Sequence, residues 1–102
     1  MSAKGYWIAS VEVTDAGGYE QYRQANAVAF AKYGAKFLVR AGKFELAEGG
    51  AKSRNVVIEF PSYEQAVACY HSPEYQHAKS LRKDAAFCDL IIIGGYDGTQ
   101  PA

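Results

Sequence analysis

The first third of the chain combines a strand pattern with a helix pattern. Residues 6–13 are rich in β-branched and aromatic side chains and predict a strand. Asp15 is suited to cap a helix that runs to about Tyr33 and ends at Gly34. Five residues of this helix recur at steps of three and four, so they share one face: Tyr19, Tyr22, Asn26, Phe30 and Tyr33.

The middle of the chain predicts two further strands joined by a turn. Residues 36–48 form the first of them, with residues 37–40 as its clearest part and Gly42 as a bulge or bend. The glycine pair at 49–50 supplies the turn. Residues 54–60 follow as a strand with three consecutive apolar side chains at its centre.

Two short helices and a last strand complete the pattern. Ser62 and Gln65 form a capping box, which predicts that a helix begins there. That helix breaks at Ser72 and Pro73, where a third helix begins, because serine is a good N-cap and proline suits the first helical position. Residues 88–93 are the last strand.

The order strand, helix, strand, strand, helix, strand is that of the ferredoxin-like α+β fold, a βαββαβ two-layer sandwich. An 18-residue helix is about 27 Å long and an eight-residue strand about 26 Å, so the helices can lie along the sheet. The chain has 102 residues, of which 49% are apolar and 22% charged. This composition predicts one globular domain over residues 1–102, with its core within about 4–96.

Both faces of the predicted sheet are apolar, although the helices can cover only one. Successive strand residues point to opposite faces, yet residues 90–93 (LIII) and 56–58 (VVI) are apolar without interruption. Burying one exposed Ile, Val or Leu is worth roughly 1.5–3 kcal/mol. We therefore predict a homodimer whose sheets pack against each other. The alternative is a monomer with a somewhat apolar surface.

Composition excludes several classes of function. Lys plus Arg and Asp plus Glu number 11 each, so the net charge is zero and no basic segment indicates nucleic-acid binding. Apolar runs such as residues 90–93 are far shorter than the roughly 20 residues that cross a bilayer, and residues 1–6 lack the apolar stretch of a secretory signal. Two cysteines do not make a disulfide framework, so we predict a cytoplasmic protein without membrane contact.

Four segments carry a family resemblance: residues 4–8 (KGYWI), 37–40 (FLVR), 54–62 (RNVVIEFPS) and 69–75 (CYHSPEY). Together they resemble the domain-of-unknown-function 1330 family over about residues 4–93. The resemblance implies the dimeric α/β-barrel superfamily, whose ferredoxin-like subunits pair through their sheets. The family has no settled activity, and analogy with the superfamily suggests cofactor-free oxidation, isomerisation or decarboxylation of small aromatic or keto compounds. The chain departs from the family's pattern at Gly17-Gly18, and at Ala41, where glycine is usual.

Polar residues on otherwise apolar elements are candidates for a binding site. Asn26 interrupts the aromatic face of the long helix, so its amide either contacts a ligand in a cleft between helix and sheet or makes a structural hydrogen bond. Arg40 and Glu59 are charges within apolar strands. In the functional interpretation Arg40 holds a substrate carboxylate and Glu59 acts as a base; the alternative is a structural ion pair or two solvated charges.

Residues 70–75 concentrate polar groups at a helix break. Free N–H groups at the start of a helix can bind an anion, and Ser72 would add its hydroxyl and Tyr75 its polar ring. His71 is a second catalytic candidate, because its unperturbed pKa lies near neutral, although its position varies in the family that the chain resembles. The alternative is that this segment only caps a helix.

No metal or cofactor is predicted. The soft ligands Cys69, His71, His77 and Cys88 match no zinc spacing, and neither a phosphate-binding loop nor a catalytic triad pattern is present. The leading hypothesis is a small homodimer that binds or transforms a small organic molecule in a pocket between helices and sheet, lined by Tyr and Phe rings. The alternative is a non-catalytic dimer that binds a metabolite or a protein partner.

Overall fold

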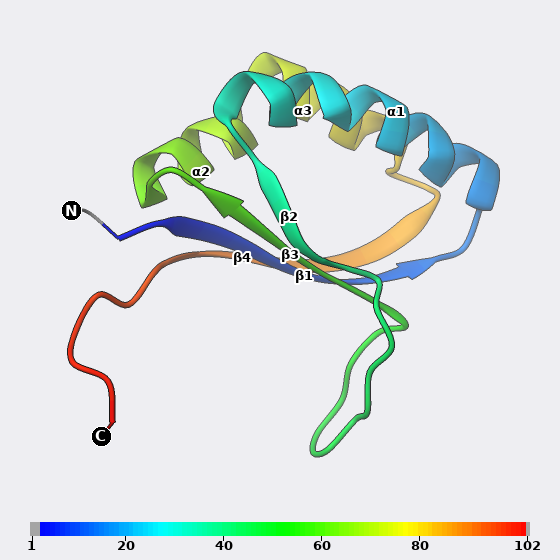
Figure 1. The fold of residues 1–102 in the computed structure, drawn as a ribbon. Coiled ribbons are helices and arrows are strands. Elements are labelled where there is room, and N and C mark those ends of the chain that lie inside the picture. Colours follow the sequence, from blue (N-terminus) through cyan, green and yellow to red (C-terminus); the bar gives the residue numbers. More distant parts are fainter. Residues whose placement is uncertain (1–2, 102) are drawn as a thin grey trace.

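The chain forms a four-stranded antiparallel sheet with helices on one face. The computed structural model describes residues 3–101, and Figure 1 shows the three helices on the same side of the sheet. The strand order is β2-β3-β1-β4, which confirms the predicted ferredoxin-like α+β fold. The dimeric barrel requires a second chain and stays a prediction. In chain order the elements are β1 (Gly5–Val13), α1 (Ala16–Tyr33), β2 (Lys36–Arg40), β3 (Arg54–Phe60), α2 (Tyr63–His71), α3 (Pro73–Leu81) and β4 (Ala86–Gly94).

Local sequence signals set the helix ends. The Asp15 carboxylate accepts two backbone N–H groups in the first turn of α1 at 3.1 and 3.3 Å, and Gly34 ends α1 with a φ of 72°. The Ser62 hydroxyl accepts the N–H of the third residue of α2 at 3.0 Å. Ser72 does the same for α3 at 3.1 Å. All three helix starts lie where the sequence predicts them.

β2 is shorter than the sequence pattern suggests. The sequence predicts a strand over residues 36–48, but pairing with β3 ends at Arg40. Residues 41–53 instead form a long loop that projects away from the helices (Figure 1). Ala41 has a φ of 57°, in the left-handed region, which turns the chain out of the sheet. The bulge or bend predicted at Gly42 corresponds to the turn at the neighbouring Ala41, and a separate bulge lies within β2 between Phe37 and Val39.

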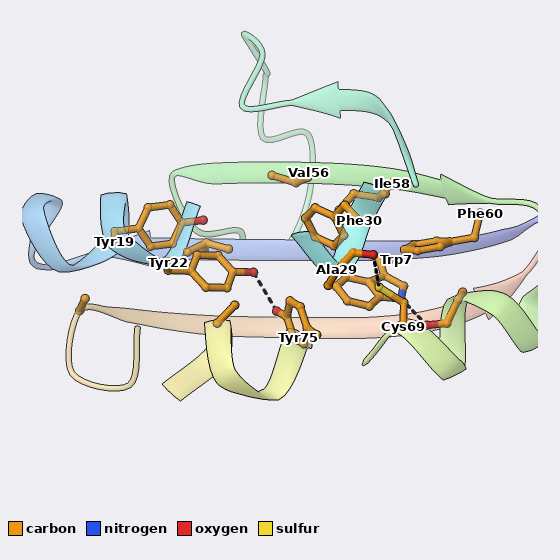
Figure 2. Close-up of a cluster of buried hydrophobic side chains, with 14 residues drawn as sticks. Trp7, Tyr19, Tyr22, Ala29, Phe30, Val56, Ile58, Phe60, Cys69 and Tyr75 are labelled. Atoms are coloured by element: carbon orange, nitrogen blue, oxygen red, sulfur yellow. Dashed lines mark hydrogen bonds between the residues drawn. The ribbon is translucent and has the colours of Figure 1, made fainter. Parts of the chain in front are cut away.

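Trp7 lies at the centre of the core between the sheet and the helices. It is 1% exposed, and its indole N–H donates to the carbonyl of Ala66 in α2 at 2.9 Å. Figure 2 shows the aromatic side chains that gather around it. Four rings have centroids between 4.8 and 5.8 Å from that of Trp7: Phe30, Phe60, Tyr70 and Tyr75. The aromatic content of the chain is thus used largely to pack one face of the sheet.

The opposite face of the sheet carries no helix from residues 3–101 (Figure 1). Ile8 of β1 lies on it, together with Phe87, Ile91 and Ile93 of β4, and these four residues are between 43% and 66% exposed. The structure therefore confirms that both faces of the sheet are apolar. None of the helices that it describes is long and apolar enough to cross a bilayer.

Candidate functional site: an arginine-lined cleft

A cleft opens between α1 and the helix-covered face of the sheet. Its cavity volume is about 40 Å³, and the cleft is open to solvent at its mouth. α1 contributes Tyr19, Tyr22 and Asn26 from its buried face. Apolar side chains of β1, β3 and β4, among them Val56 and Leu90, form the floor. The site is therefore built from the same helical face that the sequence singles out.

Every arginine of the chain lines this cleft: Arg23, Arg40, Arg54 and Arg82. Each comes from a different element or connection. The first lies in the middle of α1, the second ends β2, the third begins β3 and the fourth follows α3. Only the folded chain brings these four positions to one place.

A β-bulge in β2 directs Arg40 into the cleft. Phe37 lies opposite Ile58, and Arg40 lies opposite Val56. Both β3 partners face the helices, where they are 4% and 7% exposed. Without the extra residue in the bulge, strand alternation would send Arg40 to the open face. The guanidinium carbon of Arg40 lies 4.1 Å from the centroid of the Phe37 ring, as expected for two side chains on the same face of β2.

Aromatic rings also support two other guanidinium groups. The guanidinium carbon of Arg54 lies 5.6 Å from the centroid of the Tyr19 ring, and that of Arg82 lies 5.1 Å from the Tyr22 ring. Contacts of this kind contribute about 0.5–2 kcal/mol each. They hold planar cations against the aromatic wall of the cleft.

A hydrogen-bond network lies behind the cleft wall. The hydroxyl groups of Tyr22 and Tyr75 are 2.7 Å apart, and Figure 2 shows the two side chains pointing toward each other. Arg82 Nη2 donates to the Tyr75 oxygen at 3.4 Å. Burial raises the pKa of both phenols, so both are neutral at pH 7 and one donates to the other. The network links Arg82 to α1.

Three of the four arginines have an Nε–H group that is buried and has no hydrogen-bond partner: Arg23, Arg54 and Arg82. A buried donor without a partner costs about 1–3 kcal/mol, and more when it is charged. In residues 3–101 the only other side-chain atom in this situation is Oε1 of Glu74. The three unsatisfied donors thus belong to residues that line the cleft.

The cleft unites two of the predicted ligand-binding residues. Asn26, 7% exposed, and Arg40 both line it. Tyr75 is fully buried behind the lining, where it contacts Tyr22 and Arg82 as described. The hydroxyl of Ser72 donates to a carbonyl of α2 at 2.7 Å and caps α3, so the structure gives it capping contacts.

The expected approach of Arg40 to Glu59 does not occur. Glu59 lies opposite Tyr6 of β1 and Lys36 of β2, on the open face, where the Tyr6 hydroxyl donates to its carboxylate at 3.3 Å. Strand register and alternation thus place Arg40 and Glu59 on opposite faces of the sheet. His71 is exposed at the end of α2 and lines a different hollow. Neither catalytic candidate lines the cleft.

Sequence reasoning missed three of the four cleft arginines. Arg23 could have been found, because it follows Tyr19 by four residues and precedes Asn26 by three on the same helical face. Arg54 and Arg82 carry no such signal, because they stand at the ends of elements next to connecting segments.

Metal ligands do not assemble in the part of the chain that the structure describes. Residues 3–101 contain no group of three His, Cys, Asp or Glu side chains that could hold an ion. Cys69 is fully buried, and burial raises its pKa to about 12. Its thiol is therefore protonated at neutral pH and unsuited to nucleophilic chemistry.

The family model described as "Domain of unknown function (DUF1330)" matches residues 4–96. The chain belongs to this family. The match confirms the family resemblance that the sequence segments indicate. A comparison with curated proteins finds no match for this DUF1330 chain.

Solved structures share its fold at low sequence identity. A protein of unknown function from Rhodopseudomonas palustris is 21% identical, with a TM-score of 0.72 over 96% of this chain and 86% of the other. SnoaB, a cofactor-independent oxygenase from Streptomyces nogalater, is 11% identical, with a TM-score of 0.66 over 99% and 100% of the two chains. A dimeric protein of unknown function with a ferredoxin-like fold, from Bacteroides fragilis, is 11% identical, with a TM-score of 0.58 over 89% and 95%. At these identities the likeness shows only the fold of this DUF1330 protein. Its activity has to be argued from its own residues.

Proposed function

We propose that this protein binds a small organic molecule in the cleft between α1 and the sheet. The observation that carries the proposal is the set of four arginine side chains in an otherwise largely aromatic and aliphatic lining. Small-molecule sites combine an apolar lining with a few polar groups that fix orientation. A ligand with acceptor atoms would bind the guanidinium groups of the lining while its apolar part contacts the Tyr and Phe rings.

Binding is favoured over acid–base catalysis by the composition of the lining. Among the described residues, neither a carboxylate nor an imidazole lines the cleft. A catalytic role for Glu59 or His71 stays a prediction, and it requires a substrate that reaches them outside the cleft. The likeness to SnoaB, described as a cofactor-independent oxygenase, supports a small-molecule site by fold analogy alone.

The arginines themselves provide the test. The chain has only four of them, so a ¹⁵N-labelled sample gives at most four Nε–H signals in an NMR spectrum. A library of small ring-containing compounds, neutral and charged, is titrated into this sample. We expect at least one compound to shift the signals of Arg23, Arg54 or Arg82 together with the side-chain amide of Asn26. If no compound shifts them at millimolar concentration, the proposal is wrong.

We also propose that the protein is a homodimer that pairs through the open face of the sheet. Ile8, Phe87, Ile91 and Ile93 are close to half exposed or more there, and burying each is worth roughly 1.5–3 kcal/mol. The Bacteroides fragilis protein of the same fold is described as dimeric, which supports the proposal.

Light scattering at micromolar concentration tests the dimer. We expect a mass of about 22 kDa, twice the 11.1 kDa of one chain. Ile91→Lys places a charge in the middle of the proposed interface and should give a folded monomer. Val28→Lys is the control, because Val28 is 61% exposed on α1, away from the sheet. A wild-type mass near 11 kDa would overturn the proposal.

A further inference from the structure

The basic side chains that line the cleft are all arginines. All four arginines line the cleft, whereas none of the seven lysines does so. In residues 3–101 no Asp or Glu belongs to the lining either. The chain as a whole is electrically neutral, so this local excess of positive charge reflects the placement of residues rather than overall composition.

The excess charge has little compensation nearby. Among the described residues, the ion pairs involve only one of the four arginines: Arg23 with Glu20 at 3.1 Å. The other two pairs join Lys32 to Glu74 and Lys52 to Asp89. Arg40, Arg54 and Arg82 thus face the cleft without a carboxylate partner. An anionic ligand would supply the missing charge, and a neutral one would not.

We propose, on the basis of the binding function above, that the ligand is a planar aromatic carboxylate. A guanidinium group presents its N–H donors in a flat fork that matches both oxygens of a carboxylate, whereas an ammonium group is a point charge. The exclusive use of arginine therefore points to geometric recognition of a carboxylate. The Phe37, Tyr19 and Tyr22 rings, which already stack on guanidinium groups, form a wall suited to a flat ring.

Three probes separate the parts of this inference. Benzoate is aromatic and anionic, benzamide has nearly the same shape without the charge, and cyclohexanecarboxylate keeps the charge without the aromatic ring. Each is titrated into the ¹⁵N-labelled wild-type protein at pH 7 while the arginine Nε–H signals are followed. We expect benzoate to bind at least about tenfold more tightly than either of the other two, because a charge-assisted hydrogen bond contributes about 1.5–3 kcal/mol.

Failure of the inference can be distinguished from failure of the binding function. If benzamide binds as tightly as benzoate, the cleft binds organic molecules but does not select for charge, and the inference is overturned. If cyclohexanecarboxylate binds as tightly, the aromatic part is overturned. If none of the three probes, and no compound of the wider library, shifts the arginine signals, the binding function itself fails.

Variants of individual basic residues test which side chains bind the benzoate. Arg40→Gln removes a guanidinium group from an exposed strand end, where the fold should tolerate the change, and should weaken benzoate binding by about tenfold. Lys43→Gln removes the same charge from the projecting loop and should leave the affinity unchanged. Arg54→Lys keeps the charge but loses the fork, so it should weaken benzoate binding as well. If the Arg40 and Lys43 variants lose the same amount of benzoate affinity while their circular dichroism spectra stay native, only long-range charge matters and the inference is refuted.

Discussion

Replacing Tyr75 with phenylalanine removes a single oxygen atom from the network behind the cleft. In the native structure this oxygen lies 2.7 Å from the Tyr22 hydroxyl and 3.4 Å from Arg82 Nη2. Tyr75 is fully buried and Tyr22 is 8% exposed, so water cannot readily replace the lost partner. The Tyr22 hydroxyl would be left in a dry environment without its closest hydrogen bond.

The magnitude follows from this geometry. Losing the hydrogen bond between two buried hydroxyls costs about 1–3 kcal/mol, so Tyr75→Phe and Tyr22→Phe should each lower the free energy of unfolding by that amount. The first should cost more, because it also removes the acceptor of Arg82. The double variant removes both oxygens and leaves no orphaned phenol. Its cost should be smaller than the sum of the two single costs by about 1 kcal/mol or more.

Urea unfolding of the four proteins, followed by the fluorescence of the single tryptophan, measures this coupling. All samples need the same protein concentration, because dimerisation would make stability concentration-dependent. Tyr63→Phe is the control: Tyr63 is 45% exposed, and its change should stay within about 0.5 kcal/mol. If the costs of the two single variants sum to the cost of the double variant within about 0.5 kcal/mol, the two hydroxyls are not coupled and the reasoning is refuted.

Three further experiments test other features of the fold. A Cβ atom at Gly5 would lie 2.4 Å from the Ser62 carbonyl oxygen, whereas one at Gly42 meets nothing within 4 Å; in thermal melts Gly5→Ala should therefore cost about 1–3 kcal/mol and Gly42→Ala little, and equal melting temperatures would contradict this. Ala41→Gly should raise stability by up to about 1 kcal/mol, because Ala41 has a φ of 57°; a lower melting temperature would argue against strain at this position. Burial raises the pKa of Cys69 from 9.0 to about 12, so the unfolded chain loses this proton first and stability falls as pH rises between these values. Cys69→Ala should make that fall shallower in urea titrations between pH 8 and 10.5, and an unchanged slope would assign the effect to other groups.

The helix boundaries illustrate what a local pattern can predict. Asp15, Gly34, Ser62 and Ser72 each act on backbone groups within a few residues of themselves, so the sequence displays both partners of each contact. The length of β2 could not be obtained in this way. Residues 43–46 alternate between charged and apolar side chains as a strand would, but they have no neighbouring strand, because the chain turns away at Ala41.

The candidate site was predictable only in part. Asn26 stands out in the sequence because a polar amide on an aromatic helical face is conspicuous, and the structure places it in the cleft. The sequence also singles out Arg40, but as a residue that approaches Glu59. Both residues lie in neighbouring strands, and the one-residue bulge in β2 decides which face Arg40 occupies.

The sequence by itself determined the order of the elements, the helix ends and the apolar character of both sheet faces, because these depend on residue types at short spacing. Only the tertiary structure decided that four arginines from separate parts of the chain meet in one cleft and that Glu59 lies on the other side of the sheet. The physical reason is that a strand side chain's face depends on register and bulges, which are set by pairing between distant segments. No local sequence pattern indicates that pairing.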